Sequence, residues 1–114
     1  MSRFVHLMAS LAALSMALSP ALANAQSDFP NRPLKLVIGF APGGSTDIIG
    51  RIIAQKLSER LGQPVVIENK AGAGGTIGAD ATAKAAPDGY TLTLGTTSTH
   101  AIAAGAYSKL PYNP

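Results

Sequence analysis

The sequence of 114 residues contains no cysteine and no tryptophan. Without cysteine the chain cannot form a disulfide, hold a metal through thiolates or carry a lipid on a cysteine. Charged residues are also scarce, at 13% of the chain, and the formal net charge is only +3. The basic residues are spread along the sequence, without a cluster and without interleaved aromatic residues. This distribution argues against a nucleic-acid-binding protein.

Residues 1–25 have the pattern of a secretory signal peptide. A weakly basic start precedes an almost unbroken apolar run, and small residues follow at Ala21, Ala23 and Ala25. We expect cleavage after Ala25, with residues 26–114 exported to the periplasm. The alternative is an uncleaved membrane anchor, but the apolar run is too short to cross a bilayer comfortably.

An apolar run over residues 34–40 leads into a Pro-Gly-Gly turn and then into a predicted helix. Such a run is typical of a parallel strand that is covered on both faces. The turn that follows it should direct free backbone N–H groups and the positive end of a helix dipole toward one small region. We therefore predict an anion site at residues 41–47, with a carboxylate as the favoured ligand.

A helix is predicted over residues 46–61, capped by Ser45 or Thr46, with Asp47 in its first turn and Gly62 at its end. Polar side chains fill one face of this helix. The apolar side chains recur at helical spacing and predict an amphipathic helix. These apolar residues are Ile48, Ile49, Ile52, Ile53, Leu57 and Leu61.

Two more strands and two more helices are predicted in alternation. The strands cover residues 64–69 and 90–95, and the helices cover residues 76–86 and 100–107. With short connections, this order predicts an α/β fold, a parallel sheet with helices on both faces. Ligands bind such sheets beyond the carboxyl ends of the strands. The loops that should converge there are 41–46, 70–76 and 96–100.

Three other interpretations of the glycine-rich turns each fail on a missing feature. Gly44-Ser45-Thr46 lacks the lysine of a Walker phosphate loop. Residues 43–47 lack the last glycine of a G-x-S-x-G nucleophile elbow, and His100 has no assigned orienting partner. Residues 72–78 resemble a dinucleotide fingerprint, but the last glycine comes one position late and the run follows the second strand.

Polar side chains near these loops have both a structural and a functional interpretation. His100 is exposed to water or donates a hydrogen bond to a ligand. Asp47 stabilises its helix or acts as a general base. The hydroxyls of residues 96–99 satisfy local backbone groups or contact a ligand. Glu68 is expected to be a solvated charge at the rim.

Three segments together resemble one known family. They are residues 33–47 with the Pro-Gly-Gly turn, residues 68–78 with the second glycine-rich turn, and residues 87–92 with a Pro-Asp-Gly turn, followed by Leu-Pro-Tyr-Asn-Pro at the end. In order and spacing they are similar to the periplasmic substrate-binding receptors of tripartite tricarboxylate transporters, the Bug family. The resemblance covers residues 30–114.

The resemblance implies a type II periplasmic-binding-protein-like fold, in which two α/β lobes close on a carboxylated solute. It implies no enzymatic activity and no cofactor or metal, with a small carboxylate as ligand and membrane transporter subunits as partners. Charge-assisted hydrogen bonds from turn amides suit a carboxylate, and bridging waters suit varied acids. The implied ligand-binding residues are Ala41, Gly43, Gly44, Ser45, Thr46, Asp47, Gly74, Gly75, Thr97, Ser98 and Thr99.

Family members are much longer than this chain. We therefore expect residues 26–114 to form only the N-terminal part of the first lobe, as a truncated product that is poorly stable and binds weakly. One alternative is a non-functional remnant of such a receptor. Another is an α/β enzyme lobe, but the sequence offers neither a nucleophile–base pair nor a phosphate-loop lysine.

Overall fold

The computed structural model describes residues 28–114, so the expected signal peptide lies outside the described residues. None of the helices within 28–114 combines the length and the apolarity needed to cross a membrane. Strands and helices alternate along the chain as the sequence predicts. The elements are β1 (Leu34–Ile38), α2 (Ser45–Leu61), β2 (Val65–Asn69), η1 (Ala73–Gly75), α3 (Thr76–Ala83), β3 (Thr91–Thr93), η2 (Ser98–Ile102) and α4 (Ala103–Ala106). Of the two short helical segments, η1 is a 3₁₀ helix and η2 is a π-helix.

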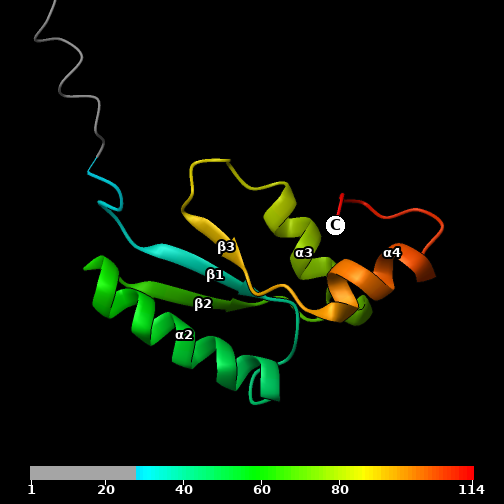
Figure 1. The fold of residues 1–114 in the computed structure, drawn as a ribbon, viewed down its shortest axis with the longest axis horizontal. Coiled ribbons are helices and arrows are strands. Elements are labelled where there is room, and N and C mark those ends of the chain that lie inside the picture. The colour runs from blue at the N-terminus through cyan, green and yellow to red at the C-terminus, as the bar shows by residue number, and fades with distance from the viewer. Residues whose placement is uncertain (1–27) are drawn as a thin grey trace, which may run out of the picture.

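The three strands form one parallel sheet in the order β2-β1-β3. Figure 1 shows α2 on one face of this sheet and α3 on the other. The central strand β1 forms the core, because Leu36, Val37 and Ile38 are almost completely buried. The parallel sheet with flanking helices confirms the predicted fold class. The central strand β1 is apolar nearly throughout because helices cover both faces of the sheet.

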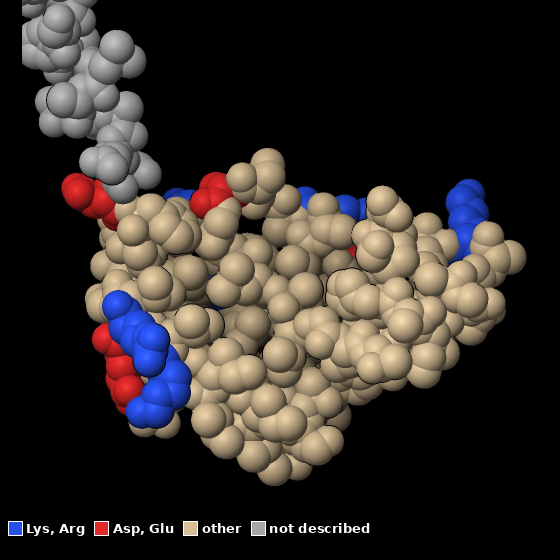
Figure 2. All heavy atoms as spheres, in the orientation of Figure 1, with Lys and Arg blue, Asp and Glu red and all other residues tan. Residues whose placement is uncertain are grey.

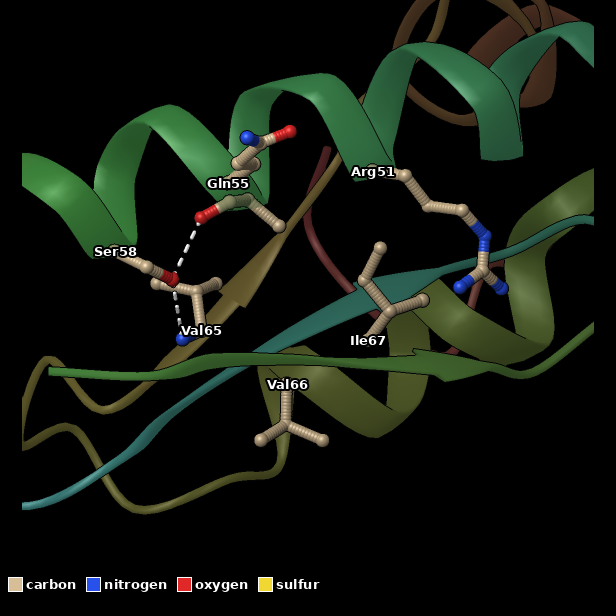
Figure 3. A pocket seen from close by; sticks show the side chains of 7 residues that line it. Arg51, Gln55, Ser58, Val65, Val66 and Ile67 are labelled. Atoms are coloured by element: carbon tan, nitrogen blue, oxygen red, sulfur yellow. Dashed lines mark hydrogen bonds between the residues drawn. The ribbon is translucent and has the colours of Figure 1, made fainter.

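Helix α2 packs on the sheet through small residues. Gly50 and Ala54 are buried, and a Cβ atom added at Gly50 would lie 2.4 Å from Cδ1 of Ile38. One turn further, the Ser58 hydroxyl donates to the Ala54 carbonyl and accepts the N–H of Val65, both at 2.8 Å. Figure 3 shows this hydroxyl between α2 and β2. The small side chains let the helix backbone lie close to the strands.

The isoleucines of α2 do not face the sheet. Ile48, Ile49, Ile52 and Ile53 are exposed, although their spacing predicted an amphipathic helix. The helix itself is confirmed, but the sheet contacts its small residues and not its large apolar ones. Periodicity identifies residues that share a face and does not say which face meets the sheet.

The predicted cap of α2 is wrong, and its predicted end is confirmed. Gly44 occupies the N-cap position, with an extended backbone and no side-chain capping bond, so Ser45 and Thr46 lie inside the helix. The Asp47 side chain instead reaches back to the N–H of Gly43, the residue before the N-cap. At the other end Gly62 adopts the left-handed conformation that terminates a helix.

The close approach of α2 generates a stability prediction. Gly50→Ala places a methyl group against the buried Ile38 side chain, so we expect the free energy of unfolding to fall by about 1–3 kcal/mol. Gly105→Ala is the matched control, because a Cβ at Gly105 in α4 would meet nothing within 4 Å. Urea unfolding followed by circular dichroism measures both variants. Equal stability of the two variants would contradict the packing described for α2.

Candidate functional site

The three loops that follow the strands lie in contact at one edge of the sheet. Gly75 on the second loop sits between the first and third loops: a Cβ there would lie 3.0 Å from Cζ of Phe40 and 2.7 Å from Cγ2 of Thr99. The backbone of Gly75 also passes close to Gly39, where an added Cβ would lie 2.6 Å from the Gly75 carbonyl oxygen. This close approach requires glycine, and it holds the three loops together.

The first loop is fixed by the carboxylate of Asp47, which is only 2% exposed. Its Oδ2 accepts the N–H of Gly43 at 2.9 Å and Nε of Arg51 at 2.9 Å. Its Oδ1 accepts Nη2 of Arg51 at 3.3 Å and Nδ2 of Asn69 at 2.9 Å. We call Asp47, Arg51 and Asn69 the carboxylate clamp. It joins the turn, the helix and the end of β2.

The clamp favours the ionised form of Asp47. Hydrogen bonds from the Arg51 side chain, the Gly43 N–H and the Asn69 amide hold the pKa of Asp47 well below its usual range. The same pairing raises the pKa of Arg51. Arg51 balances the charge of the carboxylate within this pair. Asp47 is therefore engaged in structure and is not free to act as a general base.

Asn69 and Arg51 are the residues that sequence reasoning missed. The Asn69 amide donates to the Phe40 carbonyl at 3.0 Å as well as to Asp47, so it bridges the ends of β1 and β2. The position of Asn69 at the carboxyl end of a predicted strand was the sequence signal for this bridge. Arg51 follows Asp47 by four residues, which places the two side chains on the same side of a helix.

The predicted ligand-binding residues differ in how accessible they are. Asp47, Gly75 and Thr99 are buried, whereas Thr46 and Ser98 are partly buried. Gly43 and Gly74 have positive φ angles of 86° and 66°, which glycine adopts without strain. The exposed members of the set are Ala41, Gly43, Gly44, Ser45, Gly74 and Thr97.

The third loop forms a local network around Thr99. The Thr99 hydroxyl accepts the N–H of Thr96 at 3.0 Å and lies 2.7 Å from Nδ1 of His100. The Thr99 carbonyl accepts the hydroxyl of Tyr112 at 2.6 Å. The side chain of Thr99 therefore satisfies local groups, as an ST-turn does. Thr97 and His100 are exposed beside it.

Glu68 lies on β2 as a partly exposed, paired charge. Its two carboxylate oxygens contact Nζ of Lys35 and Nζ of Lys70, each at 2.7 Å. The hydrogen bonds from Lys35 and Lys70 lower the pKa of Glu68 to about 2. Lys35 on the neighbouring strand is in register with Val66, two residues before Glu68, so the charge expected at the rim is partly exposed and also paired.

An open groove of about 430 Å³ lies beside the candidate site, between α2 and β2. Figure 3 shows Val65 and Ile67 turned toward α2, and Val66 turned away from it. The polar groups that line the groove are the side chains of Arg51, Gln55 and Ser58. The Ser58 hydroxyl is already bonded on both sides, Gln55 donates to Glu59, and Arg51 donates to Asp47. The three loops, with their exposed turn amides, remain the better candidate.

The clamp predicts how stability depends on pH. The pKa of Asp47 is lower in the folded chain, so its contribution is complete above the ordinary Asp pKa of about 3.9 and is lost as the pH falls further. Asp47→Asn should therefore lower the thermal midpoint by several degrees at pH 7, and the difference from the unsubstituted chain should shrink as the pH falls below roughly 4. Thermal unfolding followed by circular dichroism measures this, with Asp28→Asn as the exposed control. A constant difference at every pH would contradict the clamp.

Comparison with known proteins identifies the family of this chain. Residues 49–114, more than half of the chain, match the family described as tripartite tricarboxylate transporter family receptor. The chain is 51% identical over 85 residues to Protein BugT of Bordetella pertussis, an alignment that covers 74% of this chain and 26% of BugT. The chain spans about a quarter to a third of the length of the curated relatives it matches.

Solved structures give the same result. The MatC protein of Rhodopseudomonas palustris, solved with bound malate, is 47% identical, with a TM-score of 0.71 over 75% of this chain and 29% of MatC. Another R. palustris protein, solved with adipate, is 43% identical, with a TM-score of 0.72 over 75% of this chain and 29% of that protein. The chain belongs to the tripartite tricarboxylate transporter receptor family.

Proposed function

We propose that this chain provides carboxylate-binding loops of an extracytoplasmic solute receptor, which delivers a small carboxylate to a tripartite tricarboxylate transporter. The observation that carries the proposal is the contact of the three loops at the carboxyl edge of the sheet, around Gly75. Similar proteins with bound malate and adipate support a dicarboxylate ligand. Residues 26–114 would form the N-terminal part of the first lobe, and residues 1–25 a signal peptide for export to the periplasm.

The donors for such a ligand are backbone amides. The first N–H groups of α2 have no acceptor within the helix, and they lie at the positive end of its dipole. The exposed turn that precedes them leaves room for an anion to approach Gly44, Ser45 and Thr46. A carboxylate bound there would accept charge-assisted hydrogen bonds without needing a free arginine. Because Asp47 is engaged in the clamp, the proposed function is binding and not catalysis.

The 114-residue chain by itself should bind dicarboxylates weakly. Loops from a single sheet leave the ligand open to water, so we expect a Kd of about 1 mM or weaker for malate and adipate, near −4 kcal/mol. Amide chemical-shift changes in an NMR titration measure this. They should map to residues 43–46, 74–75 and 97–99. Adipamide, which has the same length without the charges, is the control ligand. Micromolar binding, or shifts confined to other residues, would argue against the proposal.

Ser45→Pro tests the role of the backbone donor. Ser45 is the first residue of α2, and Gly44 before it has an extended backbone, so proline fits this position without disturbing the helix. The substitution removes one N–H donor to a charged group, and we expect malate binding to weaken about tenfold. Ser45→Ala is the matched control, because it removes the hydroxyl and keeps the N–H. Equal affinities of the two variants would contradict a backbone-amide site.

A further inference from the structure

The third loop leads into a helical run that contains one widened turn. Before it, the N–H of His100 donates to the Thr96 carbonyl at 3.1 Å, which is α-helical spacing. After it, the N–H of Tyr107 donates to the Ala103 carbonyl, again at 3.1 Å and with α-helical spacing. Between them, the N–H of Ala103 donates to the Ser98 carbonyl, five residues back, so η2 is a π-helix. Such turns are rare overall, and many of them occur at functional sites.

The widened turn takes a donor away from the carbonyl of Thr99. In an α-helix this carbonyl would accept the N–H of Ala103, four residues later, but that N–H is bonded to Ser98. The hydroxyl of Tyr112 donates to the Thr99 carbonyl in its place, at 2.6 Å. Thr99 is only 3% exposed, and a buried carbonyl needs a hydrogen-bond partner. The bond from Tyr112 therefore favours the widened turn over a regular α-helix.

Tyr112 reaches this carbonyl because the chain folds back on itself. In Figure 1 the red C-terminal segment turns back after α4, and Tyr112 within it is partly buried. The ion pairs among residues 28–114 all lie before Gly89. Figure 2 shows most of the charged side chains of this face at its rim. A neutral hydroxyl, and not an ion pair, thus joins the C-terminal segment to the third loop.

The widened turn also determines where the third loop lies. A π-turn contains one residue more than an α-turn, so closing it would rotate the preceding residues by about 100° relative to α4. In the structure, Cγ2 of Thr99 would lie 2.7 Å from a Cβ atom added at Gly75. Thr97 and Ser98, directly before Thr99, are exposed and partly buried. The rotation would separate Thr99 from Gly75 and turn both preceding hydroxyls away from the other two loops.

We propose that Tyr112 is a positioning residue of the candidate site. Its hydroxyl stabilises the π-turn of η2 and thereby holds the third loop where the three loops meet. Tyr112 acts through the Thr99 carbonyl and does not contact the ligand. Its effect on ligand binding rests on the proposed function, whereas its effect on the turn does not.

Tyr112→Phe tests the hold on the turn, because it removes the hydroxyl and keeps the ring. Scalar couplings across hydrogen bonds, measured by NMR, identify the carbonyl that accepts the N–H of Ala103. We expect Ser98 to be the acceptor in the unsubstituted chain and Thr99 in Tyr112→Phe. The nuclear Overhauser effect between the Thr99 methyl group and Gly75 should be lost in the same variant.

Tyr107→Phe is the matched control, because it removes another tyrosine hydroxyl from the same segment. That hydroxyl lies 3.5 Å from the Ala73 carbonyl, which also accepts the hydroxyl of Thr76 at 2.9 Å. Ser98 should remain the acceptor in this variant. A Ser98 acceptor that persists in Tyr112→Phe, or one that is lost in both variants, would overturn the proposal.

If Tyr112→Phe does not fold, the unsubstituted chain decides. Two couplings are then required: one from the Ala103 N–H to the Ser98 carbonyl carbon, and one from the Tyr112 hydroxyl proton to the Thr99 carbonyl carbon. The absence of either coupling overturns the proposal.

A malate titration of the same variants tests the positioning. The unsubstituted chain and Tyr107→Phe should show ligand-induced shifts at residues 43–46 and 97–98. In Tyr112→Phe the shifts at 97–98 should fall by about half or more while those at 43–46 persist, a split that a general loss of stability would not produce. Shifts of full size at 97–98 in Tyr112→Phe would overturn the positioning role. Absence of malate shifts in the unsubstituted chain would refute the proposed function, and the couplings would still decide whether Tyr112 holds the turn.

Discussion

The candidate site depends on the buried carboxylate of Asp47. Its four accepted hydrogen bonds come from the turn, from α2 and from the end of β2. An ionised carboxylate is costly to bury unless its lone pairs are satisfied and its charge is balanced, and Gly43, Arg51 and Asn69 do both. The turn that is proposed to bind an anion is therefore held by an internal anion, Asp47 in the first turn of α2. Without Arg51, that internal charge would repel the external carboxylate that the turn amides are proposed to bind.

The second constraint is the absence of side chains where the loops cross. Added Cβ atoms at Gly39 and Gly75 would lie within 3 Å of their neighbours, so the first and second loops approach at backbone distance. Gly75 also contacts Thr99, which brings the third loop to the same place. The three loops thus meet around Gly75, with the Phe40 ring and the Thr99 methyl group against it. Such a meeting point would let donors from the ends of three strands reach the small carboxylate proposed above.

The sequence predicts the element order well, because each boundary carries a local signal. The apolar run of β1, the left-handed Gly62 and the turn glycines act within a few residues of themselves. The cap of α2 could not be predicted in this way. Asp47 reaches backward to Gly43, and its other oxygen is held by Asn69, which is distant in sequence. The orientation of α2 was equally hidden: both its isoleucines and its small residues recur at helical spacing, and only the contact of Gly50 with Ile38 decides which face is inside.

The clamp orders the proposed anion-binding turn before any ligand arrives. Asp47 in the first turn of α2 accepts the N–H of Gly43, and Arg51 and Asn69 hold the Asp47 carboxylate in turn. A turn that is already ordered loses less conformational entropy when it binds its ligand. The weak binding expected for this chain therefore follows from the exposure of the ligand to water, and not from disorder of the turn.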